Sequence, residues 1–112
     1  MATRPWRGSA AGGSYSTVDD LLALDRALLG ARLCNPAWSA WVIGGSAPAA
    51  GDNGDAAALQ SPGFAFAGGA PGISTEWLHE GAYTLIALTN RDPETSQPTV
   101  RSLGGLVRRI GP

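Results

Sequence analysis

The chain has 112 residues, including 16 Gly and 8 Pro, and its formal net charge is −1. This length allows one domain with one modest core and many turns, in which folding buries roughly 65% of the surface of the unfolded chain. A near-neutral charge excludes the basic footprint of a nucleic-acid-binding domain or a polybasic membrane patch, and no apolar run is long enough to span a membrane.

Residues 1–16 predict a loop that is rich in Gly and Ser, with Trp6 as its anchor. The first residues are polar and lead into Gly and Ser, which is not the pattern of a signal peptide. We therefore expect a cytoplasmic protein as expressed.

A helix is expected over residues 17–29. Ser16 or Thr17 supplies its cap, and the pair Asp19-Asp20 lies in the first turn, where the helix dipole favours acids. Gly30 supplies the stop. Apolar residues recur at helical spacing and define one face: Val18, Leu21, Leu22, Leu28 and Leu29.

Residues 31–60 are expected to form a variable connection between the first helix and the strands. A short helix is expected from Pro36, because proline suits the first helical turn and the stretch PAWSAWVIGG follows. Residues 44–60 are small and turn-rich, and we expect a flexible connection there. Asn53-Gly54 is a hairpin-type turn signal, but its flanks do not alternate in polarity.

Three strands are expected after this connection. The first begins at Phe64 and is broken by Gly68-Gly69 and by Pro71-Gly72. The second covers 73–79. The third, within AYTLIALTN at 82–90, is apolar on both faces, which is typical of a strand covered on both sides.

A last helix is expected after Ser96, which acts as its cap, with Pro98 in the first turn. Gly104-Gly105 costs this helix about 1–2 kcal/mol of propensity, so it depends on packing against the sheet. Its predicted apolar stripe is Val100, Leu103, Leu106 or Val107, and Ile110. Residues 1–112 thus predict a single α+β domain, in which a small antiparallel sheet of about three strands packs with an N-terminal and a C-terminal helix.

Two segments carry a resemblance to a known family. They are RPWRGSAAGGSYSTVDDLLALDRALL at 4–29 and GGAPGISTEW followed by GAYTLIALTNRDP within 68–93. Together with the final helix, they resemble the C-terminal portion of the serine β-lactamase-related family, which includes class C β-lactamases, DD-peptidases and related esterases. The resemblance implies a partial β-lactamase-like fold in a truncated chain, whose sheet lacks the partner strands that the family supplies from its N-terminal part.

The family's catalytic motifs are largely missing. All eight basic residues are Arg, so no Ser-x-x-Lys motif exists, and Tyr15-Ser16-Thr17 is not the family's Tyr-x-Asn. The third motif, Lys or His followed by x-Gly, falls on Phe66-Ala67-Gly68, and Gly69 would then offer an oxyanion-hole N–H. A phenyl ring carries no proton, so the resemblance implies a homologue that is not catalytic by the family mechanism.

An alternative is a minimal esterase that acts on small esters through a non-family serine and a retained oxyanion hole. Ser74 as nucleophile with His79 as base is the candidate pair, although alternation along a strand places the two side chains on opposite faces. The non-catalytic interpretation is that His79 is solvated or hydrogen-bonded locally and that Ser74 is an ordinary hydroxyl of a strand. The remaining candidate hydroxyls and orienting acids are Ser9, Ser14, Thr75, Glu76, Glu80 and Asp92.

No cofactor or metal is expected, because Cys34 and His79 are the only residues of their types and cannot form a closed zinc site. The possible ligands are a small ester or a β-lactam-like molecule. A third interpretation is a small-ligand binding module with a tryptophan wall, although scattered tryptophans are more typical of packing. An uncovered sheet edge invites strand addition, so we also expect self-association through that edge.

Overall fold

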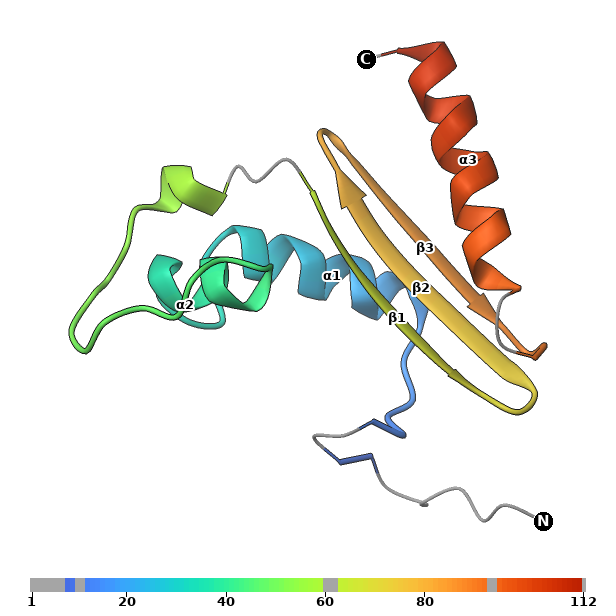
Figure 1. The fold of residues 1–112 in the computed structure, drawn as a ribbon, viewed down its shortest axis with the longest axis horizontal. Helices are drawn as coiled ribbons and strands as arrows, with labels where there is room; N and C mark the ends of the chain where they lie inside the picture. The colour runs from blue at the N-terminus through green and yellow to red at the C-terminus, as the bar shows by residue number, and fades with distance from the viewer. Residues whose placement is uncertain (1–7, 10–11, 60–62, 93–94, 112) are drawn as a thin grey trace.

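The computed structural model describes residues 8–9, 12–59, 63–92 and 95–111 (Figure 1). Within them the fold is α+β, with a three-stranded antiparallel sheet and three α-helices, as the sequence predicts. The elements in chain order are helix α1 (Val18–Leu29), helix α2 (Pro36–Val42), the 3-10 helix η1 (Ala56–Leu59), strands β1 (Phe64–Ala70), β2 (Ile73–Glu80) and β3 (Tyr83–Thr89), and helix α3 (Ser96–Ile110). Trp6, the expected anchor, lies outside the described residues.

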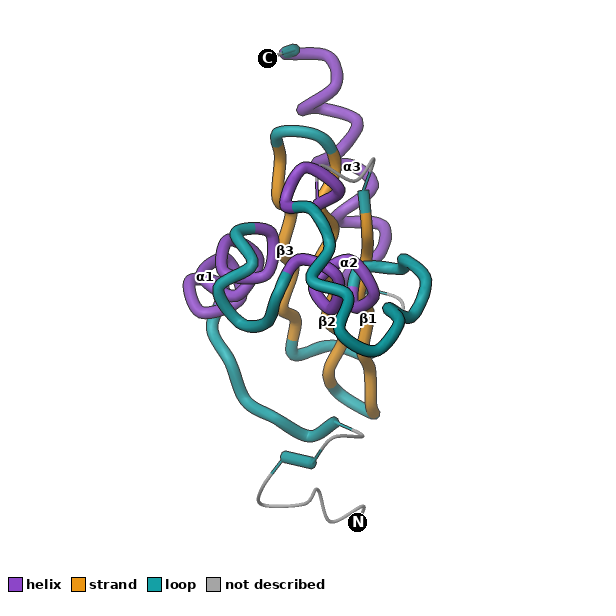
Figure 2. Tube along the Cα trace, turned by 90° about the vertical axis from the view of Figure 1, so that its left-hand side faces the viewer, coloured by secondary structure: helices purple, strands orange, loops and turns teal. Residues whose placement is uncertain are grey.

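The sheet lies between two helical layers, with α1 and α2 on one side and α3 on the other (Figures 1 and 2). Its strand order is β1-β2-β3, and Trp77 in the central strand stands opposite Phe66 of β1 and Ile86 of β3. Because side chains alternate along a strand, odd-numbered residues of β2 face α1 and even-numbered ones face α3.

Helices α1 and α2 begin where the sequence signals predict. The Thr17 hydroxyl accepts a hydrogen bond from the Asp20 amide at 3.1 Å, and Gly30 ends α1. In α2, the Asn35 side chain accepts from the Trp38 amide at 3.1 Å, with Pro36 in the first turn. Each cap pairs an amide that a helix start otherwise leaves without a partner.

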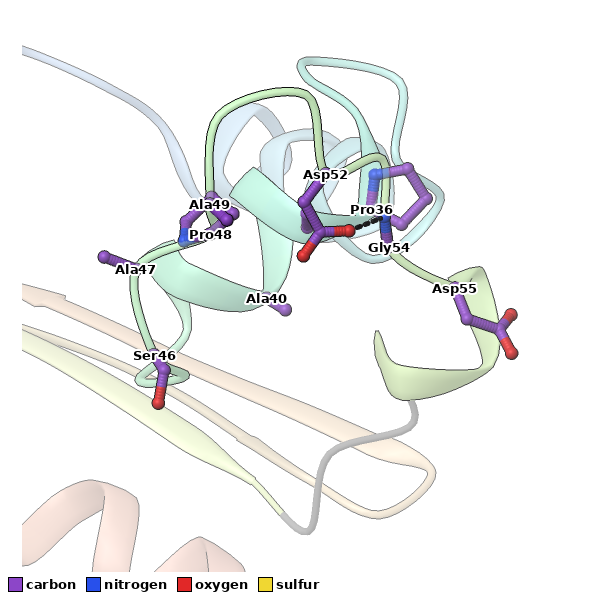
Figure 3. Close-up of a pocket in the computed structure, with 10 residues that line it drawn as sticks. Pro36, Ala40, Ser46, Ala47, Pro48, Ala49, Asp52, Gly54 and Asp55 are labelled. Carbon is purple, nitrogen blue, oxygen red and sulfur yellow. Dashed lines mark hydrogen bonds between the residues drawn. The ribbon is translucent and has the colours of Figure 1, made fainter.

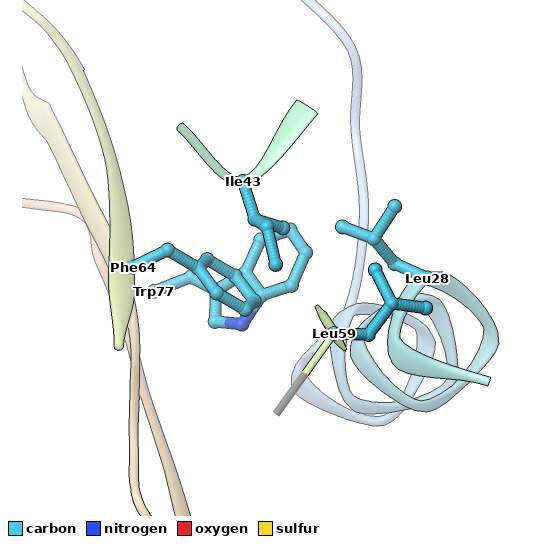
Figure 4. Close-up of a cluster of buried hydrophobic side chains, with 5 residues drawn as sticks. All are labelled: Leu28, Ile43, Leu59, Phe64 and Trp77. Atoms are coloured by element: carbon cyan, nitrogen blue, oxygen red, sulfur yellow. The ribbon is translucent and has the colours of Figure 1, made fainter. Parts of the chain in front are cut away.

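The segment between α2 and β1 contributes to the core. The Asn53 carbonyl accepts from the Ala37 amide at 3.1 Å, and Leu59 of η1 is 3% exposed. A cluster of buried apolar side chains joins the α1 side of the sheet to the helices (Figure 4). Its members are Leu28, Ile43, Leu59, Phe64 and Trp77.

The expected break of the first strand at Gly68-Gly69 is wrong. Strand β1 continues to Ala70, with Gly68 opposite Thr75 and Gly69 opposite Ser74, and the turn comes only at Pro71-Gly72. Glycine has low strand propensity, but pairing with a well-formed neighbour outweighs this local preference.

The predicted apolar stripe of α3 is wrong in part. Leu103, Leu106 and Ile110 are 40%, 54% and 80% exposed, whereas the buried positions of α3 are Ser96, Val100 and Gly104. A Cβ at Gly104 would lie 3.5 Å from Leu85, an ordinary van der Waals distance, so α3 packs directly against β3 at this position. Ser96 is the first residue of α3 rather than its cap.

Replacing Leu28 by alanine tests the core. We expect a loss of about 2–5 kcal/mol in the free energy of unfolding, because Leu28 is 4% exposed and its removal leaves a cavity. Leu24→Ala in the same helix is the matched control, since Leu24 is 38% exposed and should lose less than about 1 kcal/mol. Urea unfolding followed by tryptophan fluorescence measures both, and equal losses would contradict this assignment of the core.

Candidate functional site

The Asp25 carboxylate is the centre of a polar cluster between α1 and the sheet. Asp25 is 2% exposed, and its Oδ1 accepts from the indole Nε1–H of Trp77 at 2.8 Å. Its Oδ2 accepts from the Thr84 hydroxyl at 2.9 Å and lies 3.3 Å from His79 Nδ1. One carboxylate thereby connects helix α1 to strands β2 and β3.

The contacts determine which nitrogen of His79 carries the proton. Thr84 donates its single hydroxyl proton to Asp25, so both oxygens within reach of His79 Nδ1 are acceptors, at 3.1 Å for Thr84 Oγ1 and 3.3 Å for Asp25 Oδ2. Nδ1 therefore holds a proton and donates it. In the neutral ring, Nε2 is then an acceptor, and no other described group bonds to it.

A cavity of about 610 Å³ opens at this cluster, between α1 and the turn that joins β2 to β3. Asp25, His79 and Thr84 line it, and the His79 side chain is 14% exposed. Arg26 and Arg32 also line it, and neither forms an ion pair within the described part of the chain. The remaining lining is Leu22, Leu29, Gly30, Ala82 and Tyr83. The ring of His79 stacks on Phe64 with its centroid 5.3 Å away, which holds the imidazole plane.

Ser74 lies on the opposite face of the sheet from His79. Its hydroxyl is buried against the Ser96 hydroxyl at 2.6 Å and accepts from the Ser96 amide at 3.3 Å, so it pairs an amide at the start of α3. The structure therefore does not bring Ser74 and His79 together. Glu76 and Glu80 also face α3, and Asp92 accepts from the Gly72 amide at 2.9 Å.

The other candidate hydroxyls also lie away from His79. The Thr75 hydroxyl donates to the Gly68 carbonyl at 3.2 Å, and Ser9 and Ser14 lie exposed in the segment before α1. Buried Glu76 Oε2 has no hydrogen-bond partner in the described structure.

Phe66, Gly68 and Gly69 lie exposed along the outer strand β1. The two residues that flank a two-residue hairpin turn form two backbone hydrogen bonds with each other. Along the strands away from the turn, hydrogen-bonded and non-hydrogen-bonded pairs then alternate. Counting from the Ala70–Ile73 pair, the Gly69 amide is expected to point away from β2. Phe66, 40% exposed, stands beside Trp77 with ring centroids 5.2 Å apart.

A second cavity, of about 260 Å³, lies beside α2 (Figure 3). Asp52, one of its two acids, already accepts from the Gly54 amide at 2.8 Å, and the rest of the lining is mainly small or apolar. Within the described ranges, no group of three His, Cys, Asp or Glu side chains gathers as a metal site requires. The lone thiol, Cys34, lies 3.3 Å from the Ser39 hydroxyl.

Sequence reasoning missed Asp25 and Thr84. Asp25 stands seven residues after Val18 and three before Leu28, so it occupies a position on the apolar face of α1. An acid at such a position indicates a buried carboxylate with partners, because an unpaired buried charge is costly. Thr84 gave no local signal, since only the β2–β3 register places it beside His79.

Comparisons with protein families, curated proteins and solved structures found no match to this chain. Among the described helices, none combines the length and the apolar character needed to cross a bilayer.

Replacing Asp25 by alanine should reduce the free energy of unfolding by about 3 kcal/mol or more, because Trp77, Thr84 and His79 then lose a buried acceptor. Asp19→Ala in the first turn of α1 is the control, and should change it by less than about 1 kcal/mol. Urea unfolding gives both values. The Trp77 indole proton resonance in an NMR spectrum should move in Asp25→Ala and stay in Asp19→Ala; an unmoved resonance would contradict the bond.

Proposed function

We propose that this chain is a β-lactamase-related module that does not perform the family's acyl-transfer chemistry and acts by association, extending its sheet along the free edge of β3. The observation that carries the proposal is that β3 is packed by helices on both faces but, among the described strands, has none on its outer side. A strand of this kind is typical of the interior of a sheet.

Three features support the loss of the family's chemistry. The chain has no lysine, so no ammonium group can assist a serine. Phe66 stands where the family motif has Lys or His. Thr75, the β2 hydroxyl paired with that motif, donates to the Gly68 carbonyl, and Ser74 is buried on the α3 face and hydrogen-bonded to Ser96.

The exposed area supports association. The chain exposes 7839 Å² of surface, whereas a folded monomer of 11.4 kDa exposes roughly 5,800 Å². Part of this excess belongs to the segment before α1, in which every described residue is exposed. The excess, roughly 2,000 Å², is larger than the roughly 800 Å² that each partner buries in an interface of standard size.

Strand β3 is a better edge for pairing than β1. Its sequence, YTLIALT, is rich in β-branched and aromatic residues, and helices α1 and α3 would flank an added strand. Strand β1 contains Gly68-Gly69 and is exposed over most of its length, so it offers a less ordered template. The simplest occupant is β3 of a second copy, because antiparallel pairing of two identical strands closes with two-fold symmetry.

The chemical part of the proposal is tested with a fluorescent penicillin and a chromogenic cephalosporin. We expect no covalent adduct by mass spectrometry and a rate of cephalosporin opening equal to that of buffer, since no activated serine lies in the described part of the chain. A class C β-lactamase serves as the positive control. Stoichiometric acylation of the chain would overturn the proposal.

The association is tested by analytical ultracentrifugation of two variants. Leu88 and Phe66 are 36% and 40% exposed and lie on the same face of the sheet at opposite edges, so they form a matched pair. We expect a wild-type dimer that Leu88→Lys weakens at least about tenfold, or ~1.4 kcal/mol, because charge at an edge opposes strand pairing. Phe66→Lys should leave it unchanged. A monomeric wild type, or loss of the dimer only in Phe66→Lys, would contradict the β3 interface.

A further inference from the structure

We propose that Asp25 and His79 form a general-base site that hydrolyses small anionic esters with water as the nucleophile, in the cavity between α1 and the β2–β3 turn. This proposal does not depend on association through β3. It uses a base, an orienting carboxylate and a cavity that the resemblance to the β-lactamase-related family does not assign.

The geometry supplies an oriented base. Asp25 Oδ2 lies 3.3 Å from His79 Nδ1 and fixes the proton on that nitrogen, while Phe64 stacks on the ring. Nε2 is therefore an acceptor, and His79 lines the cavity. Within the described structure the protein pairs Nδ1 and leaves Nε2 facing the cavity side of the cluster, where a water molecule can reach it.

The reaction needs no component beyond water and the ester. Nε2 removes a proton from water while the water oxygen bonds to the acyl carbon, and Asp25 stabilises the imidazolium that forms. The tetrahedral intermediate then breaks its bond to the leaving oxygen, which takes the proton back from Nε2. The products are one carboxylic acid and one alcohol.

Water is the nucleophile because, among the described residues, no side-chain hydroxyl near His79 is free to attack. Thr84 is the hydroxyl in contact with the ring, and it donates its proton to Asp25. Ser74 lies on the other face of the sheet. The site should therefore turn over without an acyl-enzyme and without a burst of product.

The charges of the cavity select the substrate. The lining holds two guanidinium groups, Arg26 and Arg32, against the single carboxylate of Asp25, which His79, Thr84 and Trp77 already occupy. Both arginines are exposed and lack an ion pair in the described structure. A substrate carboxylate would pair with them, while Leu22 and Leu29 accept a short apolar chain.

The experiment compares 4-nitrophenyl acetate with the mono-4-nitrophenyl ester of glutaric acid, which share a leaving group and differ in charge. Hydrolysis by the wild-type chain is measured beside N-acetylhistidine at equal concentration. We expect the protein to exceed N-acetylhistidine at least about a hundredfold on the glutarate ester, the usual contribution of a positioned base. A rate no higher than that of N-acetylhistidine would overturn the proposal without any variant.

Variants then assign the roles. His79→Gln should lower kcat at least about a hundredfold. Asp25→Asn should lower kcat and alter its pH profile, which a purely structural loss would not do.

Arg26→Ala and Arg32→Ala should each raise KM for the glutarate ester about two- to fivefold, the range of an exposed ion pair, and leave KM for the acetate ester unaffected. Arg109→Ala, on α3, is the matched control and should change neither.

Circular dichroism confirms that each variant is folded. Activity that survives His79→Gln would identify a contaminant and overturn the proposal. A burst equal to the protein concentration would overturn the assignment of water as the nucleophile. Equal effects of Arg32→Ala and Arg109→Ala would overturn the selection of anionic substrates.

Discussion

The buried carboxylate of Asp25 is the interaction on which the α1 side of the molecule depends. It accepts from Trp77 and Thr84 and contacts His79, so one side chain of α1 fixes the helix against two strands. Its bonds to three residues offset the cost of burying the charge. The direction of these bonds also specifies how α1 crosses the sheet, which apolar contacts alone would leave less defined.

The two faces of the sheet are held by different means. On the α1 side, Trp77 and Phe64 join an apolar cluster, and the polar cluster of Asp25 lies at its border. On the α3 side, the contact is made by small residues, with Ser74 bonded to Ser96 and Gly104 close to Leu85. Helices cover both faces of this three-stranded sheet, but its edges are open. Backbone N–H and C=O groups without a strand partner therefore gather at the edges.

Much of the fold could be predicted from the sequence because the decisive signals are local. Thr17, Asn35 and Gly30 act where capping preferences place them, and the apolar run of β3 matches a strand covered on both faces. The orientation of α3 could not be predicted in this way. Its hydrophobic residues suggest one buried face, but its buried positions are Ser96, Val100 and Gly104, and most of the larger apolar residues stay exposed.

The candidate site shows a different limit of sequence reasoning. The alternation of side chains along β2 correctly places Ser74 and His79 on opposite faces of the sheet. This prediction requires only the two-residue period of a strand. The residues that accompany His79 come from α1 and β3, and the register that brings them together is a property of the whole sheet. The edge strand β1 carries Phe66, which has no titratable group, while Asp25 and His79 stand near the other edge of the sheet, between α1 and β3. The hydrolysis that we propose therefore rests on Asp25 and His79, which the motifs of the β-lactamase-related family do not include.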